Sequence, residues 1–450
     1  MKQSRSAVSN HRGDVSRRQF LQAAGGGAAS LAGILAAGTP PAFARSRELT
    51  FLTIASYVPD TDKELKRQFE EWGAQKGVKV RLDIIAHLQL VSKKAAEVQA
   101  RSGHDLTALG PGLGDADLYY EYLVDVDDVA HEVGEKNGGW LNEADYVVRG
   151  RWKLLPWWLA PFPIAYRTDV LQQVGEPIPD TWEGWLRVSK KAKALGHPFG
   201  TAISHTGDAN TTLLSIMWSY GASYVAKDGK TIAINSPQTR QAMEFVKRLY
   251  TEAMEPEVLA WDDASNNRCL NAGKCFAIHN PISAYESAKA AKVKLPGSDR
   301  DIADVIDHVH TPRGPVDRKV TAAYWCLGIW SFSKNADLAK DFLRYHFEPK
   351  NQYRWVEAGH GFNTPFLASM AKHPVYQSSK QYRFMPDIAK ASVPPSWPGP
   401  TTAASQQALD LYIIPDMFAQ YVVGKLTMDQ AIAWAEKELH EIYAGRRRKV

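Results

Sequence analysis

The sequence predicts an α/β protein with two lobes. Strand and helix patterns alternate from residue 48 to residue 109, and alternating elements of this length favour an α/β lobe. The chain has 450 residues, which is more than one hydrophobic core usually supports, even when an N-terminal leader is set aside. We find no internal repeat and no low-complexity linker within it.

The first lobe is predicted to open with five short elements. They follow one another as strand, helix, strand, helix and strand over residues 48–55, 62–72, 78–85, 90–101 and 105–109. Leu65, Phe69 and Trp72 recur on one face of the first helix, and Gly77 ends it. The second strand alternates apolar and polar residues, as a half-buried strand does. This β-α-β-α-β start predicts a sheet covered by helices.

The rest of the chain is predicted to be mostly helical. Pro and Trp crowd residues 152–163, which we interpret as a crossing between the lobes. Helical patterns cover 182–195, 210–220, 238–253, 336–346, 405–423 and 427–443, with a strand at 324–330 and a Pro-rich loop at 393–401. Thr181 is expected to cap the helix after it, and Ser333 or Asn335 the helix at 336. We assign residues 45–160 and 310–355 to lobe 1, and 161–309 and 356–450 to lobe 2.

The N-terminus has the layout of a twin-arginine export signal. Arg17 and Arg18 precede a mildly apolar run, Ala23 to Ala37, and Ala42-Phe43-Ala44 then offers a small-x-small cleavage site. The run is too short and too rich in Gly for a permanent membrane span. The sequence therefore predicts cleavage near Ala44, a soluble periplasmic product, and the twin-arginine translocase as a partner during export.

Charge and cysteine content exclude two classes of protein. Five basic residues and one acidic residue precede residue 45, so most of the formal net charge of +5 belongs to the leader. The basic tail, Arg446 to Lys449, is expected to be solvated, and the nearly neutral body predicts no nucleic-acid binding. Cys269, Cys275 and Cys326 are too few for a disulfide framework.

No catalytic or cofactor motif is present. The sequence lacks a Gly-x-Ser-x-Gly elbow, a His-Glu-x-x-His helix, a Cys-x-x-Cys pair and a phosphate loop. Cys269, Cys275 and His279 fit no zinc spacing, and Cys275 is expected to be buried in a strand. We therefore expect neither a metal nor a cofactor, and no enzymatic activity.

Five blocks, in order, resemble the family 1 extracellular solute-binding proteins, the sugar-type receptors of ABC importers. The blocks are Phe162–Leu171, Pro179–Trp185, Asn271–Ile278, Ser333–Leu343 and Gly424–Ala431. Each is weak alone, but all five stand in the family's order, and the resemblance extends over about residues 48 to 443. The resemblance implies a type II-like two-lobed periplasmic binding protein fold with a ligand cleft between lobes joined by hinge crossings. It also implies delivery of the solute to the membrane subunits of an ABC permease.

The ligand predicted by this resemblance is a mono- or oligosaccharide. The chain has 14 Trp, and aromatic rings cover the apolar faces of sugars while polar groups bond their hydroxyls. The resemblance places candidate ligand contacts at Tyr57, Asp62, Asp115, Trp157, Trp158, Trp325 and, more weakly, Trp261. The His279-Asn280 turn and Trp397 are further weak candidates.

Several of these residues have an ordinary structural alternative. Asp62 could instead be a helix N-cap. The glycines between Gly110 and Gly114 are interpreted as a flexible turn, because their spacing is no nucleotide fingerprint. Trp182, Trp185 and Trp355 lie in helical patterns and are expected in the core.

Two other functions stay open. The first is binding of a polyamine or other cationic solute in an aromatic box with carboxylates, for which Asp262-Asp263 beside Trp261 is the motif. The second is an exported carbohydrate-acting enzyme, which would need two carboxylates flanking the bond to be broken.

Overall fold

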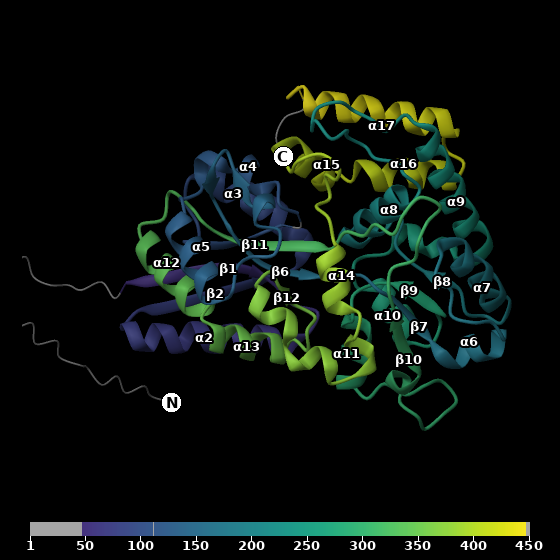
Figure 1. Ribbon diagram of the computed structural model, residues 1–450, viewed down its shortest axis with the longest axis horizontal. Helices are drawn as coiled ribbons and strands as arrows, with labels where there is room; N and C mark the ends of the chain where they lie inside the picture. Colours follow the sequence, from purple (N-terminus) through teal and green to yellow (C-terminus); the bar gives the residue numbers. More distant parts are fainter. Residues whose placement is uncertain (1–46, 111, 447–450) are drawn as a thin grey trace, which may run out of the picture. The chain divides into compact units, whose positions relative to one another are not determined.

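The computed structural model describes residues 47–110 and 112–446, and the described residues from Glu48 onward form one compact unit. Arg17, Arg18 and the predicted cleavage site lie outside the described residues. The unit contains two main sheets, which occupy separate regions of Figure 1. Among the described residues no helix has the length and apolar character needed to cross a bilayer.

The larger sheet has six strands and mixes parallel and antiparallel pairs. Its order is β12 (Thr364–Pro365), β6 (Leu155–Ala160), β11 (Ala323–Ile329), β3 (Leu106–Leu109), β1 (Glu48–Ile54) and β2 (Lys79–Ile85). β1 pairs in parallel with β2 and β3, whereas β11 is antiparallel to both β3 and β6. The α/β class is thereby confirmed.

The predicted β-α-β-α-β start is confirmed to within a few residues. Helices α2 (Pro59–Lys76) and α3 (Leu90–Ala100) connect β1, β2 and β3. Leu65, Phe69 and Trp72 are buried on one face of α2, because their helical spacing brings them onto the same side. Gly77 ends α2 with φ of 64°, a backbone conformation that a residue without Cβ adopts easily.

The smaller sheet has four strands. Its order is β10 (Ile306–Val309), β7 (Ile164–Arg167), β9 (Ala277–His279) and β8 (Phe199–Gly200). The chain passes from β6 to β7 through residues 161–163 and returns from β10 to β11 through residues 310–322. The predicted crossing at 152–163 is thus shorter, because residues 155–160 belong to a strand of the larger sheet.

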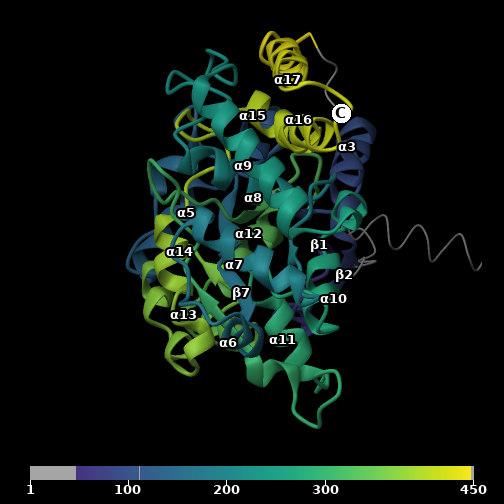
Figure 2. The ribbon, with the colours of Figure 1, turned by 90° about the vertical axis from the view of Figure 1, so that its right-hand side faces the viewer.

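Helices surround both sheets. Those that follow the larger sheet are α4 (Asp115–Leu118), α5 (Asp127–Lys136), α12 (Ala336–His346) and α13 (Pro349–Ala358). Those around the smaller sheet include α6 (Thr168–Val174), α7 (Trp182–Ala194), α8 (Gly207–Ser219), α9 (Pro237–Ala253), α10 (Ser265–Asn271) and α11 (Ser283–Ala290). In Figure 2, α7, α8 and α9 face the viewer together.

The C-terminal helices depart from the prediction in one place. The single helix expected over 405–423 is two helices, α15 (Ala403–Asp410) and α16 (Ile413–Val422), preceded by α14 (Met385–Ala391) and followed by α17 (Met428–Tyr443). Tyr412, at the junction, has φ of 53°, which a helix cannot accommodate. The break turns the chain at a residue that also lines the cavity described below.

The core is divided in the same way as the sheets. One cluster of buried hydrophobic residues surrounds the larger sheet and extends to α11, and a second surrounds the smaller sheet. Trp182, Trp185 and Trp355 are each at most 1% exposed, which confirms that they are core residues. The lobe boundaries assigned from the sequence remain a prediction.

Two cap predictions have opposite outcomes. The Thr181 side chain accepts the backbone N–H of Gly184 at 3.1 Å, as predicted. Asn335 precedes α12 without capping it, since its side-chain amide donates to the Glu48 carbonyl and the Asp105 carboxylate instead.

The cysteines also require a correction. Cys269 and Cys275 form a disulfide, so the chain does contain one such cross-link, and Cys326 is a buried free thiol. Cys275 is buried, but it precedes strand β9 instead of lying within it. Three cysteines indicate no framework of several bridges, but the count alone cannot exclude a single local pair.

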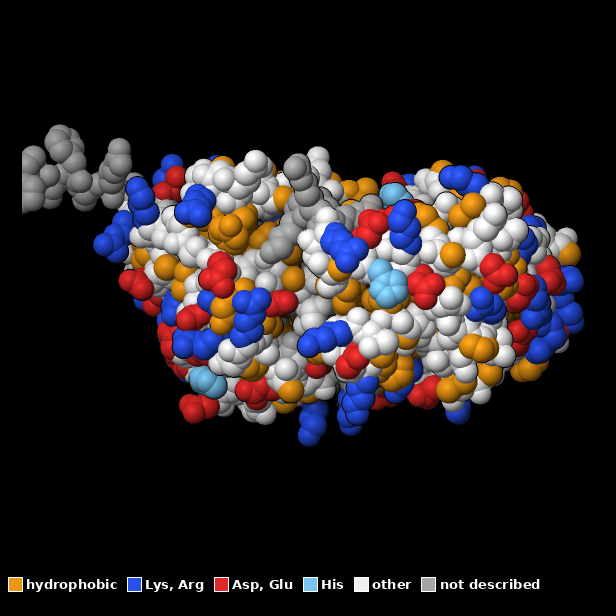
Figure 3. Space-filling view, turned by 90° about the horizontal axis from the view of Figure 1, so that it is seen from above, with side chains coloured by type: hydrophobic (Ala, Val, Ile, Leu, Met, Phe, Trp, Pro, Cys, Tyr) orange, Lys and Arg blue, Asp and Glu red, His pale blue; other side chains and the backbone are white. Residues whose placement is uncertain are grey.

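On the face shown in Figure 3, basic and acidic side chains are interspersed over the surface.

Candidate functional site

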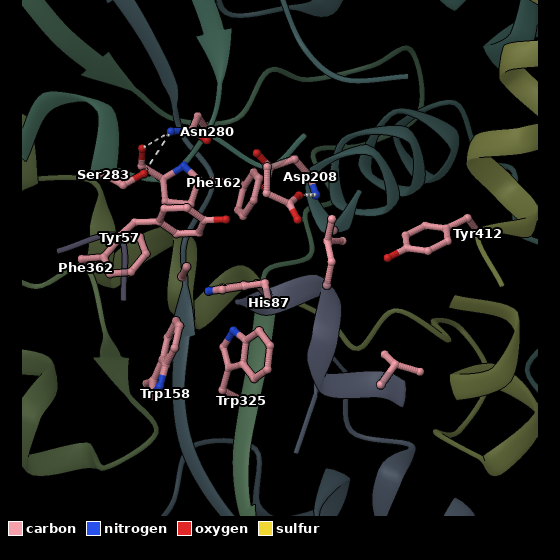
Figure 4. Close-up of a pocket in the computed structure, with 17 residues that line it drawn as sticks. Tyr57, His87, Trp158, Phe162, Asp208, Asn280, Ser283, Trp325, Phe362 and Tyr412 are labelled. Carbon is pink, nitrogen blue, oxygen red and sulfur yellow. Dashed lines mark hydrogen bonds between the residues drawn. The ribbon is translucent and has the colours of Figure 1, made fainter. Parts of the chain in front are cut away.

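A cavity of about 680 Å³, including its solvent-open mouth, lies between the edges of the two sheets. Strands β6 and β11 of the larger sheet supply Trp158 and Trp325 to it. The start of α8 supplies Asp208, and the loop after β9 supplies Asn280. Figure 4 shows these side chains around the cavity, with Trp158 and Trp325 on one side and Asp208 and Asn280 on the other.

An aromatic wall, formed by Trp158, Trp325, Tyr57 and Phe362, bounds one side of the cavity. Trp158 is the cross-strand partner of Trp325, and their rings stack with centroids 5.7 Å apart and an interplanar angle of 28°. Opposed residues of antiparallel strands project on the same face, which explains why both rings reach the cavity. Tyr57 packs edge-on against Phe362 at 6.5 Å.

The His87 ring packs against two members of the aromatic wall. Its ring lies edge-on to Trp325 at 5.2 Å and within 4.8 Å of the Tyr57 ring centroid. Burial lowers the pKa of His87 to about 4, and its Nε2 lies 2.9 Å from the Ala55 carbonyl oxygen. The ring is therefore neutral at pH 7, with Nε2 as the donor, and brings no positive charge.

An acidic pair, Asp208 and Asp263, lines the opposite side. The backbone N–H of Asp208 donates to Asp263 Oδ1 at 3.1 Å, and Asn266 Nδ2 donates to Asp208 Oδ2 at 2.5 Å. Burial raises the pKa of Asp263 to about 6, and Asp262 adds to the effect. Burial and the charge of Asp263 also raise the pKa of Asp208. Two carboxylates in so little water resist simultaneous ionisation.

A network of amide side chains holds the acidic pair in place. Asn266 Nδ2 donates also to Asn280 Oδ1, Asn280 Nδ2 donates to Asn267 Oδ1, and both distances are 2.7 Å. Asn267 Nδ2 donates to Ser283 Oγ at 3.1 Å. Asn266 and Asn267 belong to α10, whose C-terminal end is tied by the Cys269–Cys275 disulfide. The disulfide thus supports one wall of the cavity.

A second hollow of about 440 Å³ adjoins the first. The two share Val91, Gly207, Ala323 and Tyr412, so Tyr412 stands where they meet. Asp410 lines the second hollow, and burial raises its pKa to about 7 while Lys94 opposes the shift.

The structure brings four of the predicted residues together at the cavity: Tyr57, Trp158, Trp325 and, from the weak candidates, Asn280. Asp62 does not line it and does not cap α2. It lies inside the helix and accepts the N–H of Ser56 at 2.9 Å, which fixes the loop that carries Tyr57. Asp62 is therefore a support for the site.

The other three predicted residues lie elsewhere. Asp115 is buried in an ion pair with Lys94 and accepts the Gly110 N–H at 2.7 Å. Trp157 points to the opposite side of β6, where it stacks on Trp355 at 5.3 Å, because successive strand residues alternate in direction. Trp261 lines a separate hollow on the surface.

Several lining residues were not predicted from the sequence. They are His87, Phe162, Asp208, Phe362 and Tyr412. The position of Asp208 could have been recognised from the sequence, because Thr206 caps α8 and Asp208 therefore lies in the first turn of that helix. No sequence signal identifies Tyr412, because the residues on both sides of it have helical patterns and the break between α15 and α16 is not visible in them. No group of three or more His, Cys, Asp and Glu side chains among the described residues could hold a metal ion.

A family model described as a bacterial extracellular solute-binding protein matches residues 64–384. A probable ABC transporter-binding protein of Deinococcus radiodurans is 25% identical over 236 residues, which cover 50% of this chain and 54% of that protein. The chain thus spans about half the length of this curated relative.

Solved structures resemble the fold over most of the chain. The maltose-bound protein MalE3 of T. maritima has a TM-score of 0.74 at 20% identity, and 87% of this chain covers 98% of it. A sugar transporter from Arthrobacter chlorophenolicus with bound laminaribiose has a TM-score of 0.76 at 14% identity, with 89% and 100% covered. These likenesses confirm the predicted two-lobed α/β fold.

Proposed function

The chain belongs to the family of bacterial extracellular solute-binding proteins, and on that premise we propose that it is the receptor of an ABC importer for a mono- or oligosaccharide. It binds the sugar in the cavity between the two sheets and delivers it to the membrane permease. The observation that carries this proposal is the stacked pair Trp158 and Trp325, which faces a cavity whose other side is polar.

The two sides of the cavity match the two aspects of a sugar. The apolar C–H faces of a pyranose pack on the aromatic wall, while hydroxyl groups donate to Asp208 and Asp263 on the far side. The amide network behind the acidic pair is already satisfied internally, so these carboxylates are held in position before the ligand arrives. Such preorganisation reduces the entropy that binding must overcome.

The two sides of the cavity belong to different parts of the fold, so a ligand that binds both can close the cavity. The aromatic wall belongs mainly to the larger sheet, and the acidic pair to helices around the smaller one. A ligand that contacts both sides stabilises the closed arrangement and shifts the population toward it, with residues 161–163 and 310–322 as hinges. The closed form then docks on the permease, and no bond of the solute is broken.

A polyamine or other cationic solute is the second candidate. The acidic pair favours it, because aromatic rings and carboxylates together suit an ammonium group. A carbohydrate-acting enzyme has less support. Asp208 and Asp263 are adjacent through a backbone hydrogen bond, so they lie on one side and do not flank a bound glycosidic bond.

The receptor works in the periplasm after export by the twin-arginine translocase. Arg17 and Arg18 with the small-x-small site ending at Ala44 support this part of the proposal. Family membership supports an extracytoplasmic location independently.

Thermal unfolding with a panel of sugars, polyamines and amino acids tests the proposal. A ligand at a hundred times its dissociation constant should stabilise the protein by about 2.7 kcal/mol. Stabilisation by one sugar class, with the sugar recovered unchanged, is the expected result. Stabilisation by a polyamine alone, or recovery of a cleaved sugar, would overturn it in favour of the corresponding rival.

A further inference from the structure

The acidic pair has no positive partner in the cavity. Among the described residues that line it, none is Lys or Arg, and His87 is neutral at pH 7. Arg268, on the helix α10 that follows Asp263, is exposed and forms an ion pair with Asp262 at 2.7 Å. No cation among the described lining residues therefore stabilises the negative charge of the acidic pair, and its two carboxylates resist simultaneous ionisation unless a bound cation offsets their repulsion.

The fully buried acids of this protein are compensated, whereas Asp208 and Asp263 are only partly buried. Asp115 pairs with Lys94, Glu286 with His360, and Asp307 with Arg383 at 3.0 Å. Asp105 has no cation, but four donors surround it, from the Thr50 N–H and hydroxyl, Ser333 and Asn335. A buried carboxylate needs a counter-charge or a full set of donors.

The acidic pair has neither. Asp208 accepts a single side-chain amide, and Asp263 accepts backbone N–H groups on one oxygen, so each has lone pairs left for a ligand. Both residues line the cavity, and Figure 4 shows Asp208 there, so a bound molecule can supply the missing partner.

The surroundings of the pair are aromatic, and this is an independent observation. Tyr57, Phe162 and Tyr412 line the cavity beside Asp208. The hydroxyl groups of Tyr57 and Tyr412 have no hydrogen-bond partner among the described residues, and the fields of Asp208 and Asp263 contribute to raising the pKa of Tyr57. Ring faces and acceptor oxygens around one space attract an ammonium group.

We propose that the solute is a carbohydrate that carries an ammonium group, an amino sugar or a saccharide containing one. Its cation lies at Asp208 and Asp263, and its ring packs on Trp158 and Trp325. This inference rests on the proposed function and adds the charge of the substrate. A neutral sugar would also donate to the carboxylates, but an ammonium group adds the attraction between opposite charges, which is stronger in a partly enclosed cavity than in bulk water.

Matched sugar pairs test the inference. Isothermal titration of the purified protein compares glucosamine, galactosamine and mannosamine with glucose, galactose and mannose, and chitosan disaccharide with cellobiose. N-acetylglucosamine, which keeps the nitrogen but not its charge, is a further control, and putrescine supplies the charge without the sugar. In the pair that binds best, we expect the amine to bind at least tenfold more tightly than its neutral partner.

Two single variants, their double variant and one control show where the preference originates. Asp208→Asn and Asp263→Asn keep the side-chain shape and should each reduce the preference for the amine, and the double variant should abolish it. The control Asp429→Asn removes an exposed carboxylate that pairs with Arg240 and does not line the cavity, and it should leave the preference unchanged. Because the acidic pair repels itself, thermal unfolding without ligand should show the variants at least as stable as the wild type.

Each outcome decides between the two proposals. Equal affinity for amine and neutral sugar, or a preference that survives in the double variant, overturns the charge inference and leaves the sugar receptor intact. Tighter binding of putrescine than of any sugar overturns the sugar receptor itself. Binding of no sugar in either form overturns both.

Discussion

Trp158 on β6 and Trp325 on β11 are cross-strand partners whose rings stack on the side of the sheet that faces the cavity. The pairing of β11 with β6 shifts register between Trp325 and Cys326, immediately after this pair. The two stacked rings form an apolar surface beside the cavity, and each tryptophan residue is at most 3% exposed.

Replacing Trp325 by Ala should weaken binding of the sugar that the receptor recognises. Loss of the apolar contact is expected to cost about 2 kcal/mol, or roughly a thirtyfold rise in dissociation constant. Trp157→Phe is the matched control, since Trp157 lies on the other side of the same strand. It should lower the melting temperature with little effect on affinity, and the prediction fails if both variants bind equally weakly.

Opening the Cys269–Cys275 bond should loosen the wall that carries the acidic pair. For so short a loop, the loss is expected to be about 2 kcal/mol of unfolding free energy, accompanied by weaker ligand binding. Thermal unfolding and titration of Cys269→Ser/Cys275→Ser check this. Cys326→Ala, which alters the unpaired thiol, should keep the wild-type sensitivity to a reducing agent, and an unchanged affinity in the double variant would contradict the supporting role.

Asp410 should make the unliganded protein less stable as the pH rises. Its folded pKa is about 7, above the value of about 3.9 for an unfolded chain, so the folded state binds the extra proton between these values. The stabilisation it contributes is fully present below pH 4 and is lost as the pH rises through 7. Asp410→Asn should remove this slope, as urea unfolding at pH 4, 6 and 8 would show. A slope equal to that of the wild type would assign the effect to other groups.

Lys substitution of the arginine pair should block export. Arg17→Lys together with Arg18→Lys keeps the charge of the leader but alters the predicted recognition motif, so precursor should accumulate in the cytoplasm. Arg12→Lys, in the same leader but outside the pair, should be exported normally. Cell fractionation followed by immunoblotting measures both, and normal export of the double variant would contradict the twin-arginine assignment.

More of the fold than of the candidate site could be predicted from the sequence. The order and limits of the first five elements followed from periodicity alone, because Leu65, Phe69 and Trp72 had to share one helix face. The break at Tyr412 could not be predicted, since both flanking segments have helical sequences and the left-handed residue is not Gly.

Prediction of the site failed where it depended on the direction in which a side chain points or on its partner in the fold. Trp157 and Trp158 are neighbours on one strand, so their side chains point to opposite faces of the sheet. The sequence does not say which of the two faces the cavity. Asp115 has the residue type expected of a ligand contact, yet Lys94 from another helix neutralises it. Asp208 and Asp263 come together from distant segments, so no local pattern could pair them. The lobe boundaries stay a prediction.

The disulfide beside α10 links the binding site to the chemistry of the compartment around it. The cytosol keeps thiols reduced, whereas the periplasm oxidises them. On the proposed export route the chain folds before it leaves, with Cys269 and Cys275 still separate and the acidic pair less firmly held. On this proposed route, full affinity would be reached only after translocation, so a newly made molecule would carry little cytosolic solute out of the cell.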